Sequence, residues 1–103
     1  MAIADSHTGG LLADSVARYG LMITGAQIRA ARALLGWSAA QLAERSGISY
    51  SAIQRAENID GISSMRATNL FALQRALEDG GVIFLGAGDN RSGGDGVRLK
   101  PRS

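Results

Sequence analysis

Apolar and polar positions between residues 23 and 81 follow the spacing of short amphipathic helices. Apolar side chains recur three and four residues apart, as they do on the buried face of a helix, and glycines interrupt this pattern. Gly36 and Gly47 stand where a left-handed residue closes a helix, and Gly80-Gly81 follows the last periodic segment. The pattern predicts four helices, over residues 25–35, 39–46, 50–58 and, from Ser63 or Ser64 onward, to Asp79.

Three of these predicted helices begin at a residue that can cap them. Thr24 and Ser38 are each followed three residues later by a glutamine, Gln27 and Gln41, which is the spacing of a capping box. An apolar residue precedes each cap and another occupies the fourth helical position, as in a hydrophobic staple. Ser49 begins the third helix with half of this pattern. The helix starts are therefore defined by local side-chain chemistry.

Two short apolar segments follow the fourth predicted helix. Residues 82–85 are continuously apolar, residues 97–100 alternate, and the glycine-rich segment 86–96 separates them. We predict a β-hairpin with a long loop; a frayed tail is the alternative. Because an isolated two-stranded hairpin is marginal in water, we expect it to pack on the domain and to form a homodimer. The candidate dimer contacts are Val82, Ile83, Phe84, Leu85, Val97 and Leu99, with Phe71 of the fourth helix as a rival surface.

The first 22 residues carry a weaker pattern. Leu11, Leu12, Val16 and Tyr19 share one face if this segment is helical. Such an extra helix would pack on the domain or on a partner, and disorder over at least the first ten residues is the other expectation. The chain is thus divided into an N-terminal extension (1–22), a helical domain (23–81), and a hairpin with its tail (82–103).

The composition excludes several classes of protein. The chain has 103 residues, no cysteine and a single histidine, so disulfides, thiol chemistry and ordinary zinc sites are excluded. Its carboxylates are scattered singly, without the cluster of acid, base and nucleophile that an enzyme needs. No apolar run reaches the length that spans a bilayer. We expect a cytoplasmic protein without enzymatic activity, cofactor, metal or membrane contact.

Residues 39–56 have the spacing of a helix-turn-helix motif. Ala43 is small where two helices must cross closely, and Gly47 permits the positive φ of the turn between them. Apolar residues at Leu42, Ile48 and Ile53 would hold the two helices at their angle. This spacing is typical of proteins that place the second helix of the motif in DNA.

A polar face on the helix predicted over residues 50–58 suits the chemistry of DNA. An arginine can bind the O6 and N7 atoms of guanine, and a glutamine the N6 and N7 atoms of adenine. The candidates to contact bases are Tyr50, Ser51, Gln54 and Arg55. The candidates to contact the phosphate backbone are Ser38, Arg45, Asn58 and Arg66.

The segment ITGAQIRAARALLGWS at residues 23–38 resembles the Cro/CI or XRE family of phage-repressor-type helix-turn-helix domains. The later segments ALEDGGVIF (76–84) and GVRL (96–99) are similar to short bacterial regulators of that family. The resemblance implies a mainly α-helical domain of four to five helices with a C-terminal β-hairpin, whose third helix enters the major groove. It also implies a structural salt bridge between Arg32 and Glu57.

The positive charge available for DNA is small. Residues 23–81 hold six arginines against five acidic residues, and residues 58–63, where related domains often carry basic residues, are apolar and acidic. One copy should therefore bind DNA weakly. The leading hypothesis is a sequence-specific regulator of transcription, most simply a repressor, that binds an inverted-repeat operator in double-stranded DNA as a homodimer. The alternatives are a DNA-binding antitoxin that clamps a toxin, and a module that keeps the fold but binds a protein such as another regulator.

Overall fold

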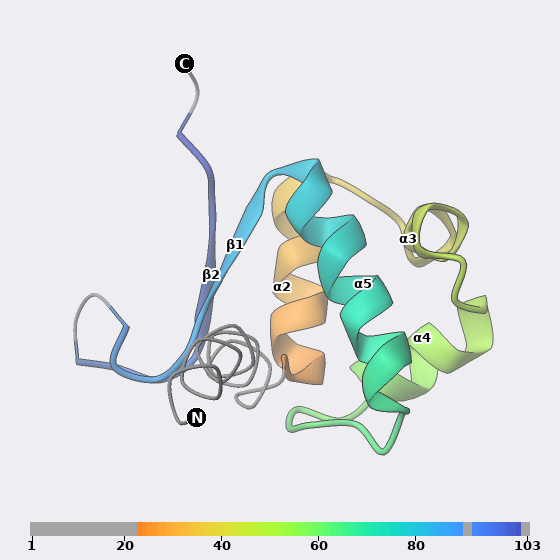
Figure 1. Ribbon diagram of the computed structural model, residues 1–103, viewed down its shortest axis with the longest axis horizontal. Helices are drawn as coiled ribbons and strands as arrows, with labels where there is room; N and C mark the ends of the chain where they lie inside the picture. The colour runs from red at the N-terminus through yellow and green to blue at the C-terminus, as the bar shows by residue number, and fades with distance from the viewer. Residues whose placement is uncertain (1–22, 90–91, 102–103) are drawn as a thin grey trace, which may run out of the picture.

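The computed structural model describes residues 23–89 and 92–101. These residues form α2 (Gly25–Leu35), α3 (Ala39–Ser46), α4 (Tyr50–Glu57), α5 (Ala67–Gly80), β1 (Val82–Leu85) and β2 (Gly96–Leu99). In Figure 1, α2 and α5 run side by side, with α3 and α4 on one side of them and the hairpin on the other. The predicted mainly helical domain with a C-terminal hairpin is confirmed. The extra helix or disorder expected at 1–22 lies outside the described residues.

The predicted capping residues begin the first three helices. The hydroxyls of Thr24 and Ser38 accept the backbone N–H groups of Gln27 and Gln41, at 3.1 and 3.0 Å. Each glutamine side chain accepts the backbone N–H of its capping residue in return, at 2.9 and 2.8 Å. Ser49 caps α4 by accepting one N–H group of its first turn. Each such cap contributes about 0.5–2 kcal/mol to helix stability.

Helix ends also follow the sequence prediction closely. Gly36 ends α2 with φ 70° and Gly47 ends α3 with φ 77°, both in the left-handed region that glycine occupies without steric cost. Helix α4 ends at Glu57, one residue before the predicted end, and Asn58 forms its C-cap. The turn from α3 into α4 therefore needs only three residues, 47–49.

Helix α5 begins at Ala67, so the predicted start near Ser63 or Ser64 is wrong. The Ser63 hydroxyl accepts a hydrogen bond from the N–H of Met65 at 3.0 Å, which closes a local turn. Serine side chains compete with helices in this way because they offer the backbone another partner. Arg66 then takes the N-cap position with extended backbone angles and no side-chain cap.

The core collects apolar side chains from all four helices and from β1. Its largest fully buried members on the helices include Ile28, Leu42, Ile53, Leu70, Leu73 and Leu77. No single helix could bury its apolar stripe without the others, so the elements stabilise one another. The packing is close where α2 begins: a Cβ at Gly25 would lie 1.8 Å from the Ile59 carbonyl oxygen, and the Gly25 N–H donates to the Gly61 oxygen at 2.9 Å.

The hairpin packs one of its faces on the helices. Its antiparallel register places Val82 opposite Leu99 and Phe84 opposite Val97, and opposed residues share a face. Val82 belongs to the core, and Phe84 and Val97 pack against it. The alternate positions, Ile83 and Leu85, fall on the other face. Strand β2 is Gly96–Leu99, one residue earlier than the predicted 97–100.

Gln27 fastens the loop end of the hairpin to α2. Its side-chain nitrogen donates to the backbone oxygens of Leu85 and Gly96, at 3.0 Å each, while its side-chain oxygen serves the cap of α2. The side chain is 7% exposed. Gln27 is thus a buried polar group whose donors and acceptor are all used, the arrangement that makes such burial stabilising.

Candidate nucleic-acid interface

Helices α3 and α4 form the predicted helix-turn-helix pair. Leu42 of α3 and Ile53 and Ala56 of α4 are fully buried, and half-buried Ala43 packs against them. The apolar side of α4 is therefore held in the core. Its other side faces outward.

The four candidate base-contacting residues lie on this outward side of α4. Tyr50, Ser51, Gln54 and Arg55 are all exposed, and Asn58 at the C-cap is exposed with them. Because α4 begins at Tyr50, the first turn of the helix presents Tyr50 and Ser51 at its N-terminal end. The arrangement offers donors and acceptors along one face of a helix, as a helix that enters the major groove requires.

Gln54 is oriented by a neighbour on the same face. Its side-chain nitrogen donates to the Tyr50 hydroxyl at 2.9 Å, four residues earlier on the helix. The second N–H of this amide and its oxygen remain for other partners. Bidentate recognition of adenine uses one amide N–H and the amide oxygen.

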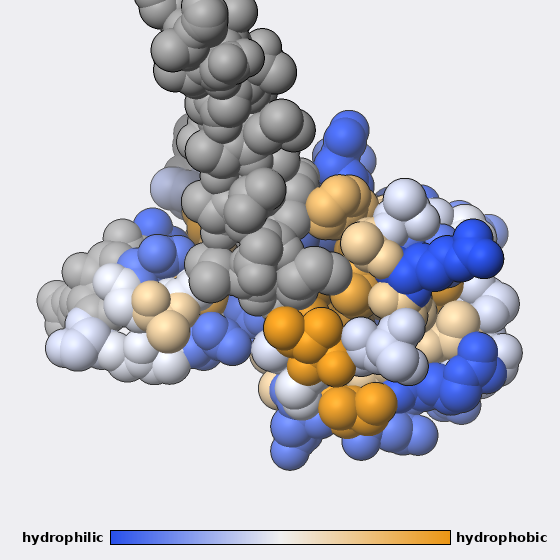
Figure 2. All heavy atoms as spheres, turned by 60° about the horizontal axis from the view of Figure 1, so that its bottom comes forward, coloured by the Kyte–Doolittle hydropathy of each residue, from blue (hydrophilic) through white to orange (hydrophobic). Residues whose placement is uncertain are grey.

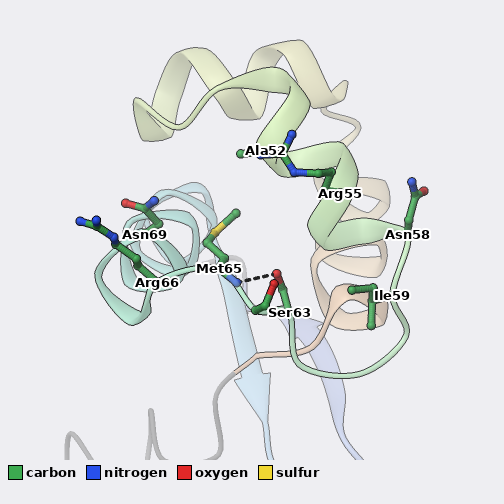
Figure 3. A pocket seen from close by; sticks show the side chains of 9 residues that line it. Ala52, Arg55, Asn58, Ile59, Ser63, Met65, Arg66 and Asn69 are labelled. Atoms are coloured by element: carbon green, nitrogen blue, oxygen red, sulfur yellow. Dashed lines mark hydrogen bonds between the residues drawn. The ribbon is translucent and has the colours of Figure 1, made fainter.

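A groove of about 550 Å³ separates α4 from the start of α5. Figure 3 shows Arg55 extending from α4 into this groove, with Arg66 and Asn69 on the opposite wall. Its lining residues are Ala52, Arg55, Asn58, Ile59, Ser63, Ser64, Met65, Arg66 and Asn69. Three of the predicted contact residues, Arg55, Asn58 and Arg66, therefore line one groove. Asn69 was not predicted, because nothing in its local sequence indicates that α5 places it there.

The remaining predicted phosphate contacts lie on α3. Ser38 is its N-cap, and Arg45 in its last turn is exposed. The Arg45 guanidinium lies over the Trp37 ring, 4.4 Å from the ring centroid, a cation–π contact that limits its orientations. Trp37 itself packs against the core, and a Cβ at Gly80 would come within 2.7 Å of its ring. Trp37 therefore joins the α2–α3 corner to the end of α5.

Arg32 and Glu57 form a bidentate ion pair between α2 and the end of α4. The Arg32 Nε and Nη2 atoms each lie 2.7 Å from a carboxylate oxygen of Glu57, whose side chain is 8% exposed. Another Arg32 nitrogen donates to the Trp37 backbone oxygen at 2.9 Å. The hydrogen bonds to Glu57 raise the pKa of Arg32 above its ordinary value, against the opposing effect of partial burial. Arg32 therefore stays charged, and its share of the stability is lost only in strong base.

A second arginine of α2 holds the same end of α4. Arg29 donates to the backbone oxygen of Glu57 and, at 2.6 Å, to a carboxylate oxygen of Asp60. Sequence reasoning missed this residue. Its only signal was the spacing of three residues from Arg32, which places both arginines on one side of α2. Together the two arginines hold the C-terminal end of α4 against α2.

The predicted dimer contacts divide between the two faces of the hairpin. Val82 is fully buried in its own domain, so its prediction as a dimer contact is wrong; it lies on the inward face at the end of α5. Phe84 and Val97 also pack inward. Ile83 and Leu85 are half-buried on the other face, and Leu99 is 44% exposed. Phe71 is half-buried on α5.

The described residues, 23–89 and 92–101, hold neither a metal-binding cluster nor a membrane-spanning helix. No group of three histidine, cysteine or acidic side chains within these ranges could hold a metal ion. No helix in this part of the chain has the length and hydropathy to cross a membrane.

Comparison with models of known protein families matches residues 28–78 to the helix-turn-helix family. The matched segment runs from the first turn of α2 to the last turns of α5, and so contains α3, α4 and the groove beside them. Comparisons with curated proteins and with solved structures find no match.

Proposed function

Because residues 28–78 belong to the XRE-type helix-turn-helix family of DNA-binding regulators, we propose that this protein is a transcriptional repressor. It binds an inverted-repeat operator in double-stranded DNA as a homodimer, in the cytoplasm. Helix α4 is its recognition helix. The assignment rests on the outward face of α4, where four polar side chains are exposed, opposite a buried side formed by Ile53, Ala56 and the ion-paired Glu57.

Base recognition is assigned to Gln54 and Arg55, supported by Tyr50 and Ser51. Arg55 has the chemistry to bind the O6 and N7 atoms of guanine, and Gln54 the N6 and N7 atoms of adenine. Tyr50 holds the Gln54 amide by a hydrogen bond of 2.9 Å. Arg29 and Arg32 hold the end of α4 against α2, so the position of the recognition helix is set by the domain itself.

Phosphate contacts position the domain on the duplex. Arg66 stands beside the recognition helix across the groove, and Arg45 and Ser38 belong to α3. Asn58 extends the same surface at the end of α4. These residues carry little base information, but they bring the recognition helix into register.

The small net charge of the domain and the apolar outer face of the hairpin both support a homodimer. Since residues 23–81 carry one net positive charge, a single copy has few phosphates to neutralise and binds weakly. A two-fold dimer presents a second recognition helix about 34 Å away, one turn of DNA. The face of the hairpin that carries Ile83 and Leu85 supports its use as the contact between copies, since these apolar side chains are turned from the helices.

A protein-binding module is the second candidate, and one observation favours it. Ile59 and Ile62 are exposed on the α4–α5 loop, where a phosphate-contacting loop would carry polar or basic side chains. A DNA-binding antitoxin would combine both properties.

Selection of bound sequences from a random pool of double-stranded DNA tests the proposal. The wild-type protein should enrich one inverted repeat, and Arg55→Ala should relax the preference at one position of each half-site. Arg75→Ala removes an exposed arginine of α5 that does not line the groove and should leave the enriched sequence unchanged. No enrichment by the wild-type protein would overturn the DNA-binding assignment and favour the protein-binding module.

A further inference from the structure

Two exposed isoleucines on the α4–α5 loop, which we call the apolar patch, make none of the proposed DNA contacts, although Ile59 also lines the groove beside α4. Ile59 and Ile62 are 46% and 52% exposed, the latter the highest value among the large apolar side chains described as exposed. Figure 2 turns this side of the molecule toward the viewer, and strongly apolar atoms are seen at its surface. Covering these two side chains would remove apolar surface from water, which is favourable.

The chemistry around the patch does not suit the DNA backbone. Asp60 lies between the two isoleucines in sequence, and its carboxylate, paired with Arg29 at 2.6 Å, is an acceptor that offers no donor to a phosphate oxygen. The isoleucine side chains carry no hydrogen-bond donor for a phosphate oxygen. An apolar occupant therefore suits the patch better than the DNA backbone does.

The chain enters the domain beside this patch. The N–H groups of Gly25 and Ala26 donate to the backbone oxygens of Gly61 and Asp60, at 2.9 and 3.4 Å. Ile23, the first described residue, is 3% exposed. The N-terminal extension is thus tethered directly next to the loop that carries Ile59 and Ile62.

We propose that residues 11–19 of this chain cover the patch, with Leu11, Leu12, Val16 and Tyr19 as the side chains that contact Ile59 and Ile62. Tyr19 precedes Ile23 by four residues, so the connecting chain reaches at most about 14 Å. A segment on so short a tether has an effective concentration of about millimolar or more. This proximity favours the extension over a separate protein as the occupant. If this segment is helical, its four apolar side chains share one face, as required of a helix that covers exposed isoleucines.

A spin label on the extension tests this contact in the full chain. The sequence has no cysteine, so Ala13→Cys gives a single attachment point. The label should broaden the methyl signals of Ile59 and Ile62 severalfold more than those of Leu34. Leu34 is a matched reference because it is 43% exposed but lies nine residues, about 13 Å, along α2 from Gly25. Adding Leu12→Ser and Val16→Ser to the labelled chain should reduce the broadening to the level that the tether alone produces.

Two outcomes would overturn the proposal. Equal broadening with and without the two serine substitutions would mean that the apolar side chains make no specific contact. A mixture of spin-labelled chains with isotope-labelled, cysteine-free chains separates contacts within one molecule from contacts between two. If the isotope-labelled chains in that mixture are broadened as much as chains that carry both labels, the patch is covered by a second copy. Neither outcome depends on DNA binding, so this experiment and the DNA selection test their two proposals independently.

Discussion

The side-chain nitrogen of Gln27 donates a hydrogen bond of 3.0 Å to the backbone oxygen of Leu85, 58 residues away in sequence. The same side chain completes the capping box of α2 through its oxygen. One glutamine therefore joins a local helix start to the hairpin. A second capping-box glutamine, Gln41, is exposed and has only the local role, and the two residues make a matched pair.

Gln27→Glu should destabilise the domain far more than Gln41→Glu. The carboxylate at position 27 keeps the cap but has no N–H to donate, and it would face the backbone oxygens of Leu85 and Gly96. Loss of partners for buried polar groups predicts a cost of about 2–4 kcal/mol. Gln41→Glu keeps a capping box in water and should change the free energy of unfolding by less than about 0.5 kcal/mol. Urea unfolding measures both; equal effects would show that the hairpin contact contributes nothing.

Glu57→Ala should lower the melting temperature without acting on DNA directly. The substitution leaves the Arg32 guanidinium partly buried without its bidentate partner, which typically costs about 3–5 kcal/mol. Glu44→Ala, on the exposed side of α3, is the control and should be nearly neutral. Full thermal stability of Glu57→Ala combined with lost DNA binding would contradict the structural role and place Glu57 in the DNA contact.

Arg66→Ala should weaken binding to all DNA sequences alike. A phosphate contact carries no base information, so the ratio of specific to nonspecific affinity should hold. The slope of log affinity against log salt should fall in magnitude by about one unit. Binding titrations at several salt concentrations measure this slope, with Arg75→Ala as the charge-matched control. An unchanged slope would exclude Arg66 from the phosphate contacts.

Tyr50→Phe should relax recognition at the base pair assigned to Gln54. The hydroxyl that accepts the Gln54 N–H is lost, and the amide becomes free to rotate, while the aromatic ring remains. Competition between operator variants should show a severalfold loss of discrimination at that base pair and unchanged discrimination at the pair assigned to Arg55. A loss of preference at both pairs would indicate that Tyr50 contacts DNA by another route.

Ile83→Ser combined with Leu85→Ser should convert the proposed dimer to a monomer. Both side chains lie on the face of the hairpin that is turned from the core, so the domain should still fold. Light scattering measures the molecular mass, and the melting temperature verifies the fold. Truncation after Gly81 is a poorer test because it removes Val82 from the core. If the doubly substituted protein remains dimeric, α5 with Phe71 becomes the favoured interface.

The helix boundaries near the N-terminus of the domain could be predicted from sequence because their determinants are local. Thr24 caps with Gln27 and Ser38 with Gln41, each pair three residues apart. Gly36 and Gly47 adopt the left-handed conformation because glycine has no Cβ. The same local reasoning failed at Ser63, where a second local structure, the turn closed on Met65, competes with the helix start. The local sequence is compatible with both structures, and the packing of α5 decides between them.

The sequence by itself determined the start of each of the first three helices and the polar face of α4, because capping and helical periodicity act within a few residues. Apart from the Arg32–Glu57 pair, which the family resemblance implied, only the tertiary structure decided the partners that lie far away along the chain. Arg29 reaches the backbone oxygen of Glu57, and Gln27 reaches Leu85, across 28 and 58 residues. Backbone oxygens are present at every position, so no residue type marks the one that will accept. Likewise Val82 turns inward because strand pairing and its junction with α5 set its face, and a continuous apolar run such as residues 82–85 has no alternation that reveals this orientation.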